Sequence, residues 1–257
     1  MQWSPLGSYV ATFHSQGIAL WGGPSWAQIV RFYHPGVRLI DFSPNERYLV
    51  TWSNEPISLA RIPAGAPHPF SEYDEGNHTI VWDIKTGALL RSFAALPTEA
   101  EQKTVRWPMF KWSPSDKYFA RVVPGQQLSV YEAPSMGLVG KKSIKIEGIV
   151  DFEWSPSLGV KSDPKLNQKE EMLAYWTPEV GNQPARVTMM AMPSKEIVRT
   201  KNLFNVTDVS KIKKWFIDGI LIYIYDIVYV VLAIQGSLLG CQGQSSYQDQ
   251  EITIHQP

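Results

Sequence analysis

The sequence predicts an all-β protein made of about four similar units, each with four antiparallel strands, which is the architecture of a partial β-propeller. Three observations lead to this prediction. An aromatic-Ser-Pro triplet occurs four times, a tyrosine lies four residues after the proline of the first three triplets, and a second apolar run follows that ends in an aromatic residue. The triplets are Trp3-Ser4-Pro5, Phe42-Ser43-Pro44, Trp112-Ser113-Pro114 and Trp154-Ser155-Pro156.

Each triplet predicts a turn between two strands. Serine at the first position and proline at the second favour a type I β-turn. Ahead of the fourth triplet, Val150, Phe152 and Trp154 alternate with acidic residues, which is the period expected of a half-buried strand. The strand after each of the first three turns begins at its tyrosine, namely Tyr9 in "YVAT", Tyr48 in "YLVT" and Tyr118 in "YFAR".

The second half of each unit contains another strand and a hairpin. From the tyrosine to the later aromatic residue the spacing is 12 in the first unit, 34 in the second and 13 in the third, counted to Trp21, Trp82 and Tyr131. We therefore expect an insertion of about 21 residues in the second unit, within residues 53–78. Gly87 in "WDIKTG" and Gly137 in "YEAPSMG" predict tight hairpins that end in a left-handed residue.

These units predict one domain over residues 1–208, with blades at about residues 1–35, 36–95, 105–147 and 148–208. The fourth blade is less regular, with "MLAYW" and "RVTMM" following a polar insertion near 157–170. Repeats of about 40 residues with four strands and a Trp-Asp pair are typical of WD-repeat propellers. Because each blade buries its faces against its neighbours, we expect four blades to form an incomplete ring.

Composition and motifs argue against catalysis. The 24 basic residues balance 24 acidic ones, so only a local patch could attract nucleic acid. The single cysteine, Cys241, excludes an internal disulfide framework, and the five histidines lack metal-ligand spacing. We expect His34 and His78, near predicted strand edges, to be structural. Phosphate-loop, zinc-protease and nucleophile-elbow motifs are missing from the sequence, so we predict no enzyme activity, no cofactor and no metal site.

Several long stretches go beyond the generic repeat, namely "QWSPLGSYVATFHSQGIALWGG" (2–23), "LIDFSPNERYLVTWS" (39–53), "MFKWSPSDKYFARV" (109–122), "YEAPSMGL" (131–138), "QPARVTMM" (183–190) and "KNLFNV" (201–206). Over about residues 2–208 they closely resemble the propeller found in the b-type subunits of eukaryotic translation initiation factor 3. This resemblance implies a cytoplasmic, non-enzymatic scaffold that joins other subunits of the factor and contacts the small ribosomal subunit and its RNA. Members of that family also carry an RNA-recognition motif and further blades, which this sequence lacks.

Basic residues in the third predicted blade are the candidates for contact with RNA or a protein partner. The densest group is Lys141, Lys142 and Lys145, with Lys111 and Arg121 nearby in the sequence. Lysines that face phosphates add affinity that depends on salt and not on base sequence. The alternative is an ordinary solvated strand face, whose charges protect an edge from aggregation.

The tail over residues 209–257 differs from the repeats. We interpret it as intron read-through that is poorly ordered, because the resemblance ends near Asp208 and Val209-Ser210 is what the bases GTAAGT encode. A membrane segment over 216–239 is an alternative, which would tether the propeller, but Asp226 in mid-run makes insertion costly and membrane binding unexpected. For the tail, a fifth blade is the remaining alternative. For the function of the whole chain, the alternative is a generic WD-repeat adaptor in another complex. The N-terminal residues do not resemble a secretory signal.

Overall fold

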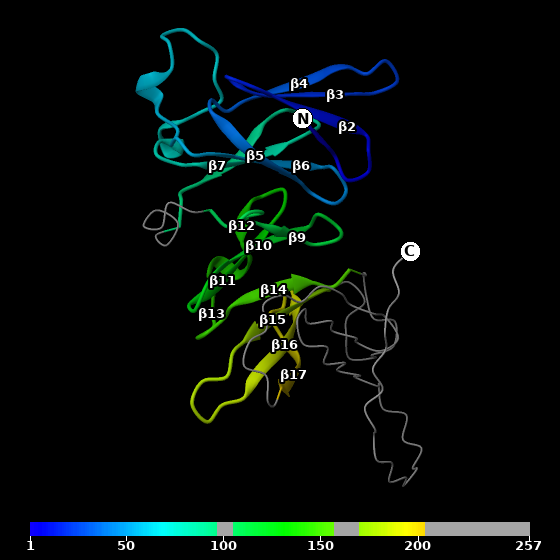
Figure 1. Cartoon of the computed structure of the whole chain (residues 1–257), viewed down its shortest axis with the longest axis vertical. Helices are drawn as coiled ribbons and strands as arrows, with labels where there is room; N and C mark the ends of the chain where they lie inside the picture. The colour runs from blue at the N-terminus through cyan, green and yellow to red at the C-terminus, as the bar shows by residue number, and fades with distance from the viewer. Residues whose placement is uncertain (97–104, 157–169, 204–257) are drawn as a thin grey trace, which may run out of the picture.

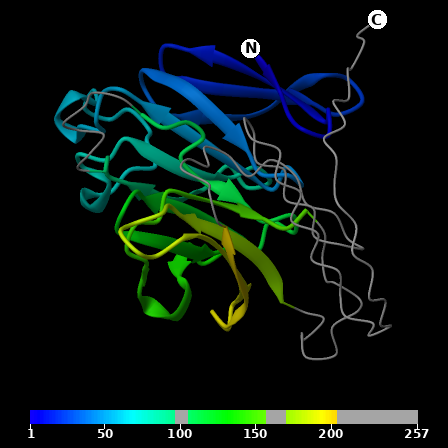
Figure 2. The same ribbon diagram turned by 60° about the horizontal axis from the view of Figure 1, so that its bottom comes forward.

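The computed structural model describes residues 1–96, 105–156 and 170–203 and confirms the all-β partial propeller. Four antiparallel sheets, called blades 1 to 4 here, follow one another face to face in chain order (Figures 1 and 2). Blade 1 holds β1 (Gln2–Trp3), β2 (Tyr9–His14), β3 (Gly17–Gly22) and β4 (Ala27–Tyr33), and blade 2 holds β5 (Val37–Phe42), β6 (Tyr48–Ser53), β7 (Thr79–Asp83) and β8 (Leu89–Phe93).

Blades 3 and 4 have the same order of strands. Blade 3 holds β9 (Lys111–Trp112), β10 (Tyr118–Val123), β11 (Gln127–Glu132) and β12 (Gly137–Leu138), and a short β13 (Ile144–Lys145) also pairs with β11. Blade 4 holds β14 (Asp151–Trp154), β15 (Glu171–Thr177), β16 (Ala185–Met192) and β17 (Ile197–Leu203). The predicted extent of the domain and of its blades stays a prediction, and residues 157–169 and 204–208 within it lie outside the described residues.

The first three Ser-Pro triplets form the predicted turns, and in each of them the serine side chain adds a second bond. The turn at the fourth triplet stays a prediction, because residues 157–169 lie outside the described residues. In blade 2 the Glu46 N–H donates to the Ser43 carbonyl at 2.9 Å, and the Tyr48 N–H donates to Ser43 Oγ at 3.0 Å. The last residue of each of these three turns has a positive φ, so the chain can enter the next strand at a tight angle. The same bonds join Ser4 to Gly7 and Tyr9 in blade 1, and Ser113 to Asp116 and Tyr118 in blade 3.

Both predicted hairpins form, but the predicted left-handed residue is right in one and wrong in the other. Gly87 has a φ of 73°, as expected, and Asp83 Oδ1 accepts a hydrogen bond from the Thr86 N–H at 2.7 Å within this turn. In the other hairpin Met136 takes the left-handed conformation, with a φ of 55°, and Gly137 starts β12 opposite Glu132. The Met136 side chain is buried between blades 2 and 3, and this packing offsets the cost of its backbone conformation.

The insertion in blade 2 lies where the spacing predicts it, between β6 and β7. It contains two 3-10 helices, η1 (Leu59–Arg61) and η2 (Glu72–Asp74), which lie on the left in Figure 1. Two carboxylates anchor it, because Glu75 accepts from the Leu59 N–H at 2.7 Å and Asp74 accepts from the Ser92 hydroxyl.

The hydrophobic core lies between blades. Three buried clusters fill the interfaces of blades 1 and 2, of blades 2 and 3, and of blades 3 and 4. Large aromatic side chains cross each interface: the Phe32 ring lies 5.3 Å from Trp82, Tyr48 stacks on Trp112 at 5.1 Å, and Tyr118 stacks on Trp154 at 6.2 Å. Each blade therefore depends on its neighbours for burial.

The tail over residues 209–257, which is interpreted as intron read-through with a membrane segment at 216–239 as an alternative, lies outside the described residues. Within the described part of the chain, no helix has the length and apolar composition needed to span a membrane.

Candidate interaction site

The five basic residues singled out from the sequence fall into two groups. Lys111 and Arg121 lie between blades, whereas Lys141, Lys142 and Lys145 are exposed on blade 3. The structure therefore does not bring the five together into one surface.

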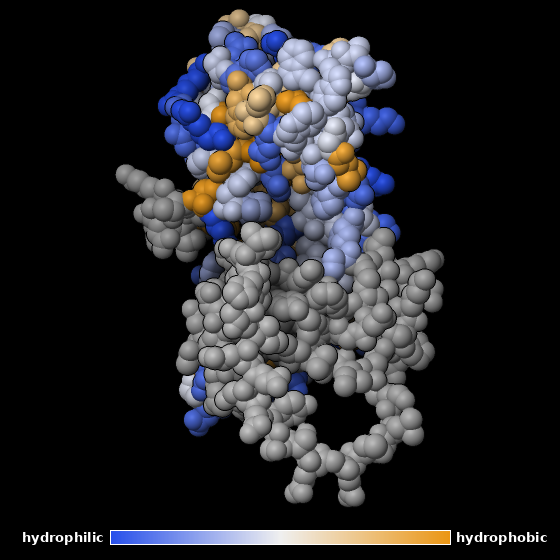
Figure 3. All heavy atoms as spheres, turned by 45° about the vertical axis from the view of Figure 1, so that its right-hand side comes forward, coloured by the Kyte–Doolittle hydropathy of each residue, from blue (hydrophilic) through white to orange (hydrophobic). Residues whose placement is uncertain are grey.

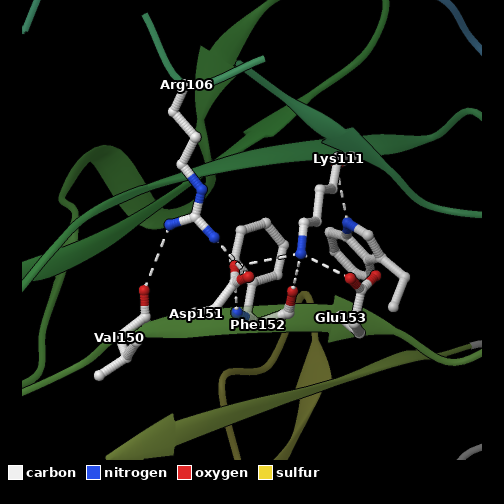
Figure 4. Close-up of polar contacts among 7 residues, drawn as sticks. Arg106, Lys111, Val150, Asp151, Phe152 and Glu153 are labelled. Atoms are coloured by element: carbon white, nitrogen blue, oxygen red, sulfur yellow. Dashed lines mark hydrogen bonds and ion pairs between the residues drawn. The ribbon is translucent and has the colours of Figure 1, made fainter. Parts of the chain in front are cut away.

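Lys111 ties blade 3 to blade 4. Its Nζ donates to Asp151 Oδ1 at 3.1 Å, to Glu153 Oε1 at 2.5 Å and to the Phe152 carbonyl at 2.7 Å (Figure 4). Arg106 pairs with the other oxygen of Asp151 and donates to the Val150 carbonyl. Burial raises the pKa of Glu153, and the charge of Lys111 offsets only part of that rise. Three acceptors thus occupy the ammonium group, and this placement favours a structural role for Lys111.

Arg121 lies between blades 2 and 3. Its guanidinium carbon is 5.3 Å from the centre of the Phe93 ring and 5.8 Å from that of Phe110, in the range of cation–π contacts. Arg91 approaches the same Phe93 ring at 4.8 Å and donates to the Met136 carbonyl. Two cations therefore share one aromatic cluster, and neither guanidinium forms an open basic surface there.

The exposed lysines lie at the edge of blade 3, next to blade 4. Lys141 ends the 3-10 helix η3 (Val139–Lys141), and Lys145 ends β13. Lys195, from the hairpin between β16 and β17, donates to the Lys142 carbonyl at 3.0 Å and so adds a fourth ammonium group. Sequence reasoning missed Lys195, because the hairpin is distant in sequence and reaches this edge only through the packing of blades 3 and 4. We call Lys141, Lys142, Lys145 and Lys195 the lysine edge.

Sequence reasoning also missed a set of acidic residues that link consecutive Ser-Pro turns. Glu46 of blade 2 accepts from the Leu6 N–H of blade 1 at 2.7 Å, and Asp116 of blade 3 accepts from Ser43 Oγ of blade 2 at 2.7 Å. In blade 4, Glu171 accepts from the Ser115 hydroxyl of blade 3. Burial alone would raise the pKa of Glu46, but hydrogen bonds from Ser4, Ser8 and Leu6 lower it below its ordinary value. The sequence did contain a signal for these links, because the fourth position of the Ser-Pro turn is acidic in blades 2 and 3, at Glu46 and Asp116.

Blade 1 exposes apolar side chains. Figure 3 shows hydrophobic side chains among hydrophilic ones in the upper part of the molecule, where the first blades lie. Trp3 is 59% exposed and its ring lies 5.4 Å from that of Trp26, edge to face. Exposed apolar patches suit contact with other protein surfaces. The other exposed apolar side chains of blade 1 beyond its first residue are Leu6, Phe13 and Ile29.

Comparison with known proteins gives closely similar sequences. The chain is 55% identical over 218 residues to the B subunit of eukaryotic translation initiation factor 3 from Mycosarcoma maydis, and 54% identical over 213 residues to that of Schizosaccharomyces pombe (strain 972 / ATCC 24843). The Aspergillus terreus (strain NIH 2624 / FGSC A1156) counterpart is 52% identical over 217 residues. Each match covers 81% of this chain and 29% of the relative. This chain belongs to the B-subunit family of eukaryotic translation initiation factor 3.

The resemblance seen in the sequence is thereby confirmed for the B-subunit family, although no protein-family model matches the chain. The chain spans about 29% of the length of these relatives. Among solved structures, a crystal structure described as that of the eukaryotic initiation factor superposes with a TM-score of 0.58 and 23% identity, over 83% of this chain and 45% of that one. The likeness to this solved structure supports the fold. The sequence relatives are subunits of a translation initiation factor.

Proposed function

We propose that this chain forms part of a non-enzymatic scaffold that acts in the cytoplasm during translation initiation. In this role it contacts other subunits of the initiation factor and the small ribosomal subunit with its RNA. The observation that carries the proposal is the identity of 52–55% to B-subunit relatives over 81% of the chain.

The contacts between blades support a scaffold. Aromatic stacking, the acidic links between turns and the Lys111 pairs all join one blade to the next, so the described blades can present a fixed surface.

The lysine edge is the surface that we assign to the ribosomal contact. Lys141, Lys142 and Lys145 are exposed, and their ammonium groups can neutralise phosphates without reading bases. Arg121 and Lys111 contribute indirectly in this proposal, by holding blade 3 between its neighbours.

Co-sedimentation of the full chain with purified small ribosomal subunits tests the proposal at several salt concentrations between about 50 and 200 mM. We expect binding that weakens with salt, and we expect the triple change Lys141→Gln, Lys142→Gln, Lys145→Gln to weaken it and to flatten its salt dependence. A matched control changes three exposed lysines elsewhere to glutamine, at Lys85, Lys117 and Lys201. A chain that stays at the top of the gradient even at low salt would favour a generic WD-repeat adaptor instead. Equal effects of the two triple variants would remove the lysine edge from the proposal.

A further inference from the structure

The outer edge of blade 3 is interrupted where the lysine edge lies. In blades 1, 2 and 4 the outermost strand is continuous, whereas in blade 3 it is divided into β12 and β13, which pair with opposite ends of β11 (Figure 1). Residues 139–143 lie between these two short strands and contain η3, in which Gly140 and Lys141 both have a positive φ, at 63° and 61°. This segment therefore lacks the strand pairing of the other outer edges, and segments of this kind open locally at a low free-energy cost.

Few contacts hold the segment in place. The Val139 side chain is buried in the cluster between blades 3 and 4, and the Lys142 carbonyl accepts from Lys195 at 3.0 Å. The Ser143 side chain is half-buried, and its hydroxyl lies 2.8 Å from that of the buried Ser129. The Ser143 hydroxyl is thus released when one side-chain hydrogen bond breaks.

Cations surround Ser143 along the chain. Lys141 and Lys142 precede it, Lys145 follows two residues later, and all three are exposed. Because side chains alternate along an extended chain, Lys145 and Ser143 point to the same face of the edge. Within residues 1–96, 105–156 and 170–203, no carboxylate forms an ion pair with any of these lysines. A serine with cations on both sides suits an enzyme whose substrate cleft is acidic.

We propose that Ser143 is a phosphorylation site that switches off the lysine edge. Ser143 Oγ attacks the γ-phosphorus of ATP, and a new O–P bond forms while the bond from that phosphorus to the β–γ bridging oxygen breaks. ADP leaves, and a carboxylate of the kinase takes the proton of the hydroxyl. The consequence for ribosome binding rests on the proposed function, in which the lysine edge contacts ribosomal RNA.

The added charge acts directly on the lysines. A phosphoserine carries a charge of about −1.5 to −2 at pH 7, and it forms charge-assisted hydrogen bonds with ammonium groups such as those of Lys142 and Lys145. About half of the positive charge of the lysine edge is then offset. The Ser129 hydroxyl can donate to the phosphate, so the modification leaves this buried group paired. RNA phosphates release fewer counterions from such an edge, so binding weakens and depends less on salt.

Protein kinase C, which modifies serines flanked by basic residues, is the probe for the site. The full chain and a free peptide of residues 137–149 are each treated with this kinase and ATP, and tandem mass spectrometry locates the phosphate. We expect Ser143 of the folded chain to react at a rate within about tenfold of the peptide, because the segment opens at a low cost. The control is Ser194, which is exposed but is not preceded by basic residues and should stay unmodified. Modification of the peptide but not of the folded chain would overturn the proposal.

Heparin, a polyanion, measures the charge of the lysine edge without any ribosome. We expect the phosphorylated chain to elute from heparin at lower salt than the unmodified chain, and to co-sediment at least about tenfold more weakly with small ribosomal subunits near 100 mM salt. Unchanged elution from heparin, or unchanged ribosome binding despite a lower elution, would overturn the switch. If neither form binds ribosomes, the proposed ribosomal contact fails, and the heparin result alone decides whether phosphorylation neutralises the edge.

Three serine variants complete the test. Ser143→Ala should block the modification and keep the heparin retention of the parent chain, whereas Ser143→Asp should lower that retention without any kinase. Ser25→Asp adds the same charge at an exposed position of blade 1 and should produce less than half of that shift. Urea unfolding verifies that all three variants fold. Equal shifts for the two aspartate variants would overturn the assignment to the lysine edge.

Discussion

Asp116 in blade 3 accepts a hydrogen bond from the Ser43 hydroxyl of blade 2 at 2.7 Å, and both residues are buried. The Asn45 N–H also donates to this carboxylate, at 3.1 Å. Ser43 Oγ in turn accepts from the Tyr48 N–H, so one side chain closes its own turn and joins the next blade. The contact therefore couples local turn geometry to the order of the blades.

Replacing Asp116 tests this coupling. We expect Asp116→Ala to lower the free energy of unfolding by about 2–3 kcal/mol, because the buried Ser43 hydroxyl and the partly buried Asn45 N–H lose a charged acceptor. Urea unfolding followed by tryptophan fluorescence measures the change. Asp116→Asn tolerates the positive φ of this position and separates backbone strain from the loss of the carboxylate.

The control for Asp116 is an exposed acid. Glu147→Ala should change stability by less than about 0.5 kcal/mol, as exposed substitutions usually do. An Asp116→Ala variant as stable as the Glu147→Ala variant would show that the link between turns contributes little.

Lys111→Met should destabilise the interface of blades 3 and 4. The change leaves Asp151 and Glu153 without the cation that lies between them, and we expect a loss of about 2 kcal/mol at pH 7. Lowering the pH should reduce this loss, since a protonated Glu153 no longer needs the ammonium group. Chemical unfolding at pH 7 and pH 5 measures both effects, with Lys117→Met at an exposed position as the control. A loss that is the same at both pH values would argue against this electrostatic explanation.

His34 and Asp41 should give opposite pH dependences of stability. Burial lowers the pKa of His34 from 6.5 to about 3, so between these values the unfolded chain binds more protons and stability falls as the pH falls. Burial raises the pKa of Asp41 from 3.8 to about 6, so in that window the folded chain binds more protons and stability rises as the pH falls. Between about pH 4 and 6 the two slopes, each up to about 1.4 kcal/mol per pH unit, should largely cancel.

Two single variants separate these contributions. Asp41→Asn should lose stability on acidification from pH 6 to pH 4 relative to the parent chain, and His34→Gln should gain stability relative to it. Urea unfolding at half-unit pH steps measures both slopes. Parallel pH profiles for the parent and either variant would contradict the assignment for that residue.

Gly17→Ala should be far more damaging than Gly7→Ala. A Cβ at Gly17 would lie 1.9 Å from the Phe32 carbonyl oxygen, and the φ of 144° is open mainly to glycine. We expect a loss of more than about 3 kcal/mol or failure to fold. At Gly7 the φ is also positive, at 77°, but no atom lies within 4 Å of the added Cβ, so we expect about 1 kcal/mol. Thermal unfolding compares the two, and similar losses would show that the β3–β4 contact can relax.

The repeated units could be predicted from the sequence because their signals are local. A Ser-Pro turn, a tyrosine four residues later and a Gly at a hairpin each constrain the backbone through nearby atoms alone. The insertion within residues 53–78 was found in the same way, as an irregular spacing between Tyr48 and Trp82.

The arrangement of the five predicted basic residues could not be deduced from such local signals. Lys111 and Arg121 look like surface cations in the sequence, yet their acceptors and aromatic partners come from neighbouring blades. The hydrogen bond from Lys195 to the Lys142 carbonyl likewise joins two residues that are far apart in the sequence.

By itself, the sequence determined the strand and turn pattern of this protein and its membership of the B-subunit family. Only the tertiary structure decided which charged side chains face solvent, that Met136 and not Gly137 takes the left-handed position, and that His34 lines a cavity with one nitrogen unpaired among the described residues. The physical reason is that burial, desolvation and pairing depend on the residues that the packing of separate blades brings together, and these residues are distant along the chain.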